Sequence, residues 1–150
     1  MSGPANTRFA IAVHLLTLLA NSGDEPVGSD VAAASIGANP VHVRRVVAYL
    51  RRADLVTSKA GVGGGIQLAY EPADISLTEV WDAVEGDEPV VAVHQGANPK
   101  CEVGRGITRT LEGLSDRATD AVRAELSDVT IADVLTETLA PPSRRRTASR

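Results

Sequence analysis

The side chains most able to do chemistry in this sequence are the basic ones of a predicted helix that starts after Asn39. Asparagine caps the free amides at a helix start, and Pro40 suits the first helical position. Apolar residues recur at helical spacing and predict one buried stripe: Val43, Val46, Val47 and Leu50. The opposite face gathers the imidazole and guanidinium groups of His42, Arg44, Arg45, Arg51 and Arg52. Guanidinium groups pair with guanine edges and with phosphates, so this face predicts contact with DNA.

A glycine-rich link, Gly61-Val62-Gly63-Gly64-Gly65, lies between two predicted short strands at residues 55–58 and 66–70. Glycine lets the backbone turn tightly and approach a phosphate closely. The link lacks the Gly-Lys-Ser/Thr ending of a nucleotide-binding loop, and it joins a strand to a strand rather than to a helix. We therefore predict that this hairpin contacts DNA through Ser58, Lys59, Gly63 and Gly64.

Taken alone, arginines on a helix face are often only solvated charge, and a glycine turn is often only a turn. The order of the elements favours DNA binding. A first helix at residues 5–20 is apolar nearly all round, and Ser29 is expected to cap a short alanine-rich helix that Gly37 ends. With the arginine helix and the glycine hairpin, these elements predict a winged helix-turn-helix. We expect a mainly α fold with one small β-hairpin, whose helical part contacts DNA through Ser29, Asn39, His42, Arg44 and Arg45.

The residues after the hairpin predict helices joined by one long loop. Ser76 and Glu79 have the spacing of a capping box, which opens a helix that ends at about residue 85. Residues 90–93 are predicted to be a short strand or an extended segment, and residues 94–104 a loop. Thr130 is expected to cap a last helix at residues 131–139.

A long helix at about residues 105–126 places apolar residues at alternating steps of four and three, as in a coiled coil: Ile107, Leu111, Leu114, Ala118 and Ala121. This seam either covers its own domain or pairs with a second copy, and the little chain left to bury it favours a homodimer. We therefore expect a winged helix-turn-helix domain at 1–86, an effector loop with dimerisation helices at 87–140, and a disordered basic tail at 141–150.

Charge is distributed unevenly along a chain whose formal net charge is −4. Residues 1–70 carry six Lys/Arg and four Asp/Glu, whereas residues 71–140 carry five and fifteen. Phosphate attraction is screened within about 8 Å at physiological salt, so the basic helix can meet DNA while the acidic part faces elsewhere. The apolar run at residues 9–20 is too short to cross a bilayer, and we expect no membrane partner.

Cys101 is the single cysteine, which excludes an intramolecular disulfide and favours a cytoplasmic setting. Three interpretations of this thiol stay open: an inert side chain, a redox switch, and part of an effector site. Lys100 and Arg105 favour the reactive thiolate, and Glu102 opposes it. A metal site shared with His94 is a weak alternative, because two ligands in a loop do not make a metal centre. No nucleophile elbow, metal motif or cofactor fingerprint is present, so no enzymatic activity is expected.

Several short segments between residues 43 and 85 carry a family resemblance: Leu-Val-Thr-Ser, Gly-Val-Gly-Gly-Gly, Pro-Ala-Asp-Ile-Ser-Leu-Thr-Glu-Val and Ala-Val-Glu. Together with residues 8–14 and with Asn98-Pro99-Lys100-Cys101 before the long helix, they resemble the Rrf2 family of bacterial transcription regulators. The resemblance implies a dimeric winged helix-turn-helix in which the long helices cross and two recognition helices meet a two-fold site on double-stranded DNA.

Many members of that family hold an iron–sulfur cluster on three closely spaced cysteines in the corresponding loop. Here the loop keeps Cys101 alone, and Arg8 and Ala12 stand where some members supply Glu and His ligands. One thiol cannot form a cluster cage, so the resemblance is to the cluster-free branch and no cofactor is expected. We therefore expect a sequence-specific regulator that acts as a repressor, with thiol or redox sensing through Cys101 as one of the open interpretations of its signal. The alternatives are a winged-helix dimer that binds proteins and a small-molecule-responsive regulator with an inert cysteine.

Overall fold

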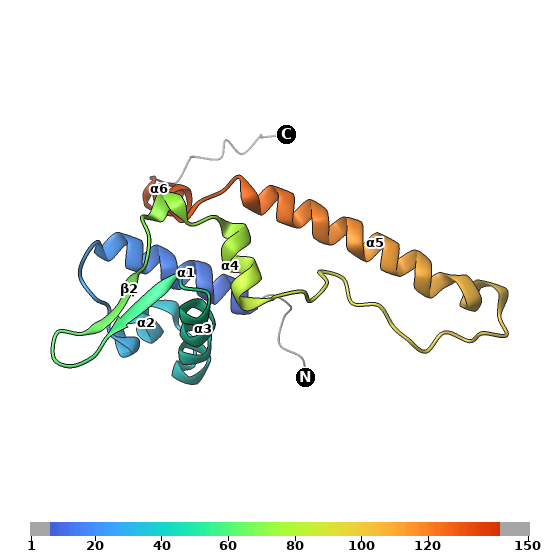
Figure 1. Ribbon diagram of the computed structural model, residues 1–150, viewed down its shortest axis with the longest axis horizontal. Coiled ribbons are helices and arrows are strands. Elements are labelled where there is room, and N and C mark those ends of the chain that lie inside the picture. The colour runs from blue at the N-terminus through green and yellow to red at the C-terminus, as the bar shows by residue number, and fades with distance from the viewer. Residues whose placement is uncertain (1–6, 142–150) are drawn as a thin grey trace, which may run out of the picture.

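A computed structural model of the protein describes residues 7–141. Its helices and strands follow one another along the chain as α1 (Thr7–Ser22), α2 (Ser29–Ile36), α3 (Pro40–Arg52), β1 (Val56–Lys59), β2 (Gly65–Leu68), the 3-10 helix η1 (Pro72–Asp74), α4 (Leu77–Val84), α5 (Glu102–Ser127) and α6 (Ile131–Leu139). The predicted first residues of α1 and the predicted basic tail from residue 142 lie outside the described residues. Figure 1 shows α5 extending to the right from a cluster formed by the other elements. Within residues 7–141, no helix is both long and apolar enough to cross a membrane.

The helix α1 lies at the centre of the hydrophobic core. Ala12, Leu15 and Leu16 are 0% exposed, and Leu19 is 1% exposed. The helix packs against α3, α4 and α6, which surround it. This burial on several sides explains why its sequence is apolar nearly all round. The mainly helical architecture with one hairpin confirms the predicted fold class.

The last helix, α6, belongs to the same core. Ile131 is 0% exposed, and its amide donates a hydrogen bond to the carbonyl of Ile75 at 3.0 Å. The amide of Leu77 donates to the carbonyl of Val129 at 2.9 Å, so α4 and α6 start side by side. Through this packing, α6 completes the core around α1.

Both α4 and α6 start with capping boxes, at the predicted pair Ser76 and Glu79 and at the predicted cap Thr130. The Ser76 hydroxyl accepts a hydrogen bond from the Glu79 amide, and the Glu79 carboxylate accepts one from the Ser76 amide. Thr130 and Asp133 form the same reciprocal pair in α6. Each box satisfies amide groups that would otherwise be left free at the helix start.

Replacing Asp133 with alanine is expected to reduce stability in a pH-dependent way. Hydrogen bonds from the backbone and side chain of Thr130 lower the pKa of the Asp133 carboxyl. A group with a depressed folded-state pKa stabilises the fold above its unfolded pKa and loses that contribution as pH falls through the folded pKa. The free-energy difference between wild type and Asp133→Ala should therefore be largest near neutral pH and shrink below the ordinary pKa of 3.8. Urea unfolding across this range measures it, with Glu137→Ala on the same helix as the control.

Two predicted boundaries, at α2 and in the hairpin, differ from the structure. Ser29 is the first residue of α2 rather than its cap, because the carbonyl of Gly28 already accepts the Ala32 amide at 3.0 Å. In the hairpin, β1 and β2 pair antiparallel with Val56 opposite Leu68, so each strand is displaced slightly from its predicted range.

The segment after α4 is extended but forms no strand within the described residues. Hydroxyl groups of α5 satisfy its backbone: the amide of Val90 donates to Thr119 at 3.2 Å, and Ser115 donates to the carbonyl of Val91 at 2.7 Å. The helix α5 also starts earlier than predicted, at Glu102, which makes Cys101 its N-cap residue. A loop predicted to reach residue 104 therefore ends at residue 101.

Candidate DNA interface

A short turn sets α2 against α3. Gly37 ends α2 in the left-handed conformation with φ 67°, where glycine carries no Cβ penalty, and its amide donates to the Ala33 carbonyl at 2.9 Å. The side chain of Asn39 accepts the Val41 amide at 2.9 Å, which confirms the predicted cap of α3. Both helix ends are closed locally, and α2 and α3 pack against each other as a helix-turn-helix.

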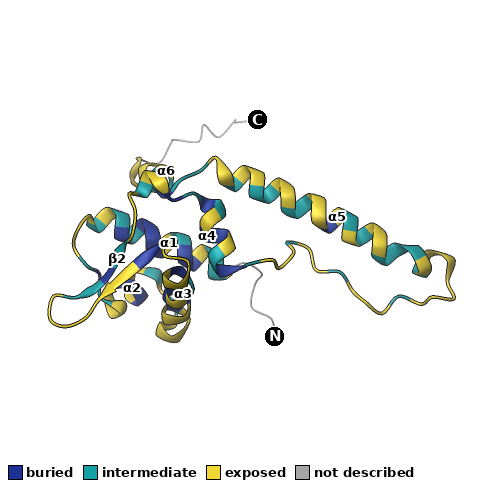
Figure 2. Ribbon diagram, in the orientation of Figure 1, coloured by how far each residue is buried: buried dark blue, intermediate teal, exposed yellow. Residues whose placement is uncertain are grey.

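The two faces of α3 have opposite roles. Its apolar stripe is buried, with Val43 and Val46 at 1% exposure and Leu50 at 0%. Figure 2 shows the outer side of α3 turned away from the buried core. The basic side chains are all exposed: His42, Arg44, Arg45, Arg51 and Arg52. The buried stripe therefore fixes which side of the helix a DNA duplex can reach.

The guanidinium groups of α3 are not neutralised by carboxylates within residues 7–141. The ion pairs of this range involve Arg8 and Arg123 instead. Arg52 lies over the ring of Tyr49 at 5.4 Å from its centroid, a contact that leaves its charge in place. Exposed guanidinium groups without carboxylate partners keep their donors for phosphates and base edges. This face is the electrostatic footprint expected of a DNA contact.

The turn of the hairpin depends on its glycines. Gly61 and Gly63 adopt positive φ angles of 89° and 75°, and the Gly64 amide donates to the Gly61 carbonyl at 3.0 Å. A Cβ on Gly64 would lie 2.1 Å from the carbonyl oxygen of Lys59, which no backbone tolerates. The turn therefore presents bare backbone to solvent. Of the residues predicted to contact DNA from the hairpin, Ser58, Lys59 and Gly63 are exposed and Gly64 is half-buried.

A third chain segment anchors the hairpin, which the sequence patterns did not indicate. Val27, between α1 and α2, pairs with Ile66 through hydrogen bonds of 2.9 and 2.8 Å. This approach is close enough that a Cβ on Gly65 would meet the carbonyl oxygen of Val27 at 2.6 Å. A bridge of one residue leaves no alternating pattern in the sequence. The apolar character of Val27 is the one local signal consistent with its pairing to the hairpin.

The predicted contact residues come from neighbouring elements. Ser29 opens α2, Asn39 closes the turn, and the remaining residues lie on α3 and the hairpin. Figure 1 places α2, α3 and the hairpin together at the lower left, away from α5. Two exposed apolar residues of α3, Val41 and Ala48, lie on the same side as Arg45, and no charge marks them in the sequence.

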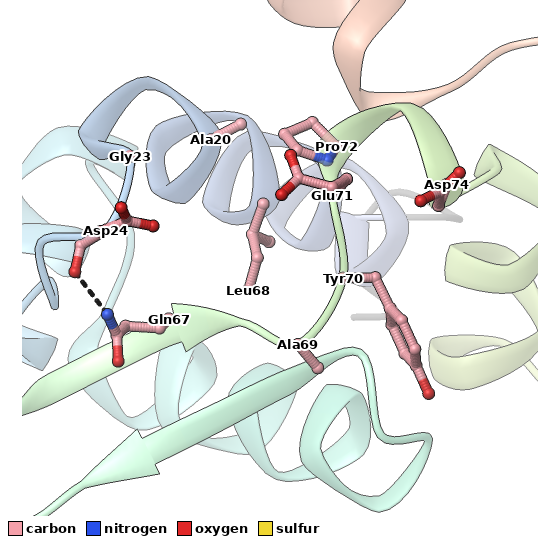
Figure 3. Close-up of a pocket in the computed structure, with 10 residues that line it drawn as sticks. All are labelled: Ala20, Gly23, Asp24, Gln67, Leu68, Ala69, Tyr70, Glu71, Pro72 and Asp74. Carbon is pink, nitrogen blue, oxygen red and sulfur yellow. Dashed lines mark hydrogen bonds between the residues drawn. The ribbon is translucent and has the colours of Figure 1, made fainter.

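A pocket of about 540 Å³ lies beside β2, between the end of α1 and η1 (Figure 3). Asp24, Glu71 and Asp74 line it together with Tyr70. Carboxylates repel phosphate, so this hollow is unsuited to the DNA backbone and lies outside the candidate interface.

The loop of Cys101 is built around Asn98. The side chain of Asn98 accepts the Lys100 amide at 2.9 Å, and its carbonyl accepts the Cys101 amide at 3.1 Å. The thiol itself is exposed at the start of α5. Gly104 makes this arrangement fit, because a Cβ there would lie 2.1 Å from the Asn98 carbonyl oxygen.

Two glycines of α5 are expected to respond oppositely to alanine. Gly104→Ala should push the Asn98 turn away from the first turn of α5 and expose Cys101 further. A Cβ at Gly106 would meet nothing within 4 Å. Gly106→Ala should therefore raise the stability of α5 by up to about 1 kcal/mol, because alanine has the higher helix propensity. Thermal unfolding and the rate of Cys101 alkylation measure both effects. Equal behaviour of the two variants would contradict the close packing at Gly104.

At the opposite end of the loop, Arg8 joins α1 to the end of α4. Its guanidinium lies 2.9 Å from the Glu85 carboxylate and 3.2 Å from that of Glu88. Glu85 is buried, with 5% of its side chain exposed, and also accepts the Phe9 amide at 3.2 Å. Burial lowers the pKa of Arg8, but the two carboxylates and a hydrogen bond with Tyr49 outweigh it and raise the pKa, so the group stays charged.

Comparison with known proteins agrees with this architecture. Residues 5–137 match the model of the Rrf2 family, described as an iron-dependent transcriptional regulator. YwnA of Bacillus subtilis, a candidate HTH-type transcriptional regulator, is 43% identical over 130 residues, which cover 87% of this chain and 96% of YwnA. The HTH-type transcriptional repressor NsrR of Streptomyces coelicolor is 30% identical over 138 residues, 90% of each protein. The structure of CymR, the global cysteine regulator of B. subtilis, has a TM-score of 0.67 and 25% sequence identity, and covers 91% of this chain and 98% of CymR.

The side chains present do not fit an iron–sulfur cluster. Cys101 is the one thiol of the chain, and Arg8 already holds two carboxylates. Within residues 7–141, no group of three or more His, Cys, Asp or Glu side chains is placed to hold a metal ion. The difference from cluster-binding proteins is limited to the side chains that would bind the iron. The match over residues 5–137 shows that the chain belongs to the Rrf2 family of transcriptional regulators.

Proposed function

We propose that this transcriptional regulator represses its targets as a homodimer bound to a two-fold DNA site, without an iron–sulfur cluster and without enzymatic activity. The observation that carries the proposal is the outer face of α3, where exposed guanidinium groups lie opposite a buried apolar stripe and have no carboxylate partner among residues 7–141. The exposed glycine backbone of the hairpin supports it as a second contact. The name of NsrR, a repressor with 30% identity, supports the direction of regulation.

The dimer is supported by the exposed apolar surface of α5. The helix extends away from the core in Figure 1 and packs within the chain against α4. Along the predicted seam Ile107, Leu111 and Ala118 are half-buried, Ala121 is exposed, and Leu114 is 48% exposed. A row of leucine and isoleucine on a long helix is stable in water when a second copy covers it. Sedimentation should give a dimer for the wild type and for Glu112→Gln, and a monomer for Leu114→Glu.

Affinity for DNA tests the central claim. The reduced protein should prefer the duplex upstream of its own gene over a scrambled duplex at about 0.15 M salt. Its binding should weaken steeply as salt rises, because each phosphate contact releases a counterion. Absence of this salt dependence would favour the second candidate, a winged-helix dimer that binds another protein.

Cys101 is proposed as the group that receives the signal. It is exposed at the start of α5, and CymR, which is similar in structure, is named a cysteine regulator. A peroxide would oxidise the thiol to a sulfenic acid with release of one water, and a small thiol would then form a mixed disulfide with release of a second water. The added group would change the packing at the start of α5 and so the separation of the two α3 helices.

Comparison of wild type with Cys101→Ser tests the thiol. Peroxide followed by a small thiol should change the DNA affinity of the wild type by more than twofold and leave Cys101→Ser unchanged. If the wild type also stays within twofold, the cysteine is inert and regulation by a small-molecule effector replaces this part of the proposal.

A further inference from the structure

The outermost line of α3 is not purely basic. Residues spaced by four, three and four positions fall on one line of an α-helix, and the line opposite the buried stripe contains Val41, Arg45, Ala48 and Arg52. All four residues are exposed, and Val41 is 55% exposed. His42 and Arg44 lie on the flanks of this line. Whatever binds α3 therefore meets two apolar side chains around Arg45 first.

We infer that Val41 and Ala48 contact the 5-methyl groups of thymines beside the base pair contacted by Arg45. This inference rests on the proposed DNA binding and specifies its sequence preference. The partner is the major groove of DNA because guanidinium groups surround the apolar pair, and thymine offers there the apolar group that distinguishes it from cytosine. A protein partner with an acidic surface would not need this alternation of methyl and guanidinium groups.

Helix geometry limits where the thymines lie. Val41 precedes Arg45 by four residues, about 6 Å along the helix axis, and Ala48 follows it by three residues, about 4.5 Å. Base pairs are spaced by about 3.4 Å, so each thymine should lie within about two base pairs of the one that Arg45 contacts. Val41 carries the larger effect, because it lies in the first turn of α3 and the start of a recognition helix enters the groove most deeply.

Deoxyuridine substitution provides the test, because uracil differs from thymine only by lacking the methyl group. The full-length protein is first used to select bound sequences from a random duplex pool. Each thymine of the selected duplex is then replaced by deoxyuridine, and affinities are measured for wild type, Val41→Ser and Ala48→Ser. Leu139→Ser is the control, because Leu139 is an exposed apolar residue, 65% exposed, at the end of α6 rather than on α3, the hairpin or the start of α5.

One or two thymines per half-site should be sensitive. Replacing such a thymine should weaken wild-type binding about fourfold, which corresponds to one buried methyl group. Val41→Ser should bind the thymine duplex more weakly and lose its sensitivity to uracil at one position, whereas Leu139→Ser should behave as the wild type.

The outcomes separate the inference from the proposal on which it rests. If no sequence is enriched from the pool, both fail. If a sequence is enriched but every uracil substitution stays within twofold, or Val41→Ser remains as sensitive as the wild type, DNA binding stands and the methyl contact is overturned.

Discussion

Replacement of Gly64 by alanine is expected to lower the affinity for the operator duplex about tenfold or more while the helical core stays folded. The new Cβ would lie 2.1 Å from the carbonyl oxygen of Lys59 and 2.9 Å from that of Gly61, so the turn has to open. Opening displaces the hairpin backbone from the phosphates it is proposed to contact. Loss of one charge-assisted hydrogen bond, about 1.5 kcal/mol, already corresponds to about tenfold in affinity.

Gly96→Ala is the matched control for this prediction. Gly96 lies in the loop before α5, and a Cβ there would meet nothing within 4 Å. Circular dichroism should show unchanged helix content in both variants, and fluorescence anisotropy with labelled operator should separate them. Wild-type affinity in a folded Gly64→Ala protein would mean that the hairpin does not contact DNA.

Replacement of Arg8 by methionine is expected to destabilise the fold by about 2 kcal/mol. Removing one partner of a buried ion pair costs about 3–5 kcal/mol, and this value is reduced here because 39% of the Arg8 side chain is exposed to screening solvent. Methionine keeps the apolar stem, so the loss reports on the charge. Glu85 would remain buried without its guanidinium partner, retaining the hydrogen bond from the Phe9 amide.

Arg123→Met supplies the control, because Arg123 also pairs with a carboxylate, that of Asp82, but both partners are more than a third exposed. Its removal should change stability by less than about 1 kcal/mol. In the Arg8→Met background, Glu85→Gln should recover part of the lost stability, because a neutral amide is less costly to bury than a carboxylate. Urea unfolding measures all four proteins. Equal losses for Arg8→Met and Arg123→Met would contradict the structural role of the buried pair.

The position of Arg8 leads us to expect an effect on DNA binding as well. Its guanidinium joins the end of α4 to α1, and the side chain of Tyr49 on α3, whose ring lies under Arg52, contributes to the raised pKa of Arg8. The loop that carries Cys101 starts directly after this cluster. A structural change in the loop can therefore reach α3 through the contacts of Arg8. We expect Arg8→Met to weaken DNA binding more than Arg123→Met does.

The local sequence determined the elements that are proposed to contact DNA. Asn39 and Pro40 set the start of α3, and the spacing of Val43, Val46, Val47 and Leu50 set its buried side, because both signals act within a few residues. The capping boxes of α4 and α6 were predictable for the same reason. The prediction that Ser29 caps α2 was wrong, because serine suits a cap and a first helical turn alike. Only the hydrogen bond from the Ala32 amide to the Gly28 carbonyl distinguishes the two positions.

Tertiary structure alone decided which distant segments meet. The pairing of Val27 with Ile66, the entry of α6 into the core through Ile131, and the contact of Arg8 with Glu85 join residues far apart in the chain. A single bridge or ion pair leaves no periodic trace in the sequence, so pattern analysis had nothing to detect. The glycines show the same division: their sequence predicted a turn, but only the approach of Lys59, Val27 and Asn98 shows why Gly64, Gly65 and Gly104 cannot carry a side chain.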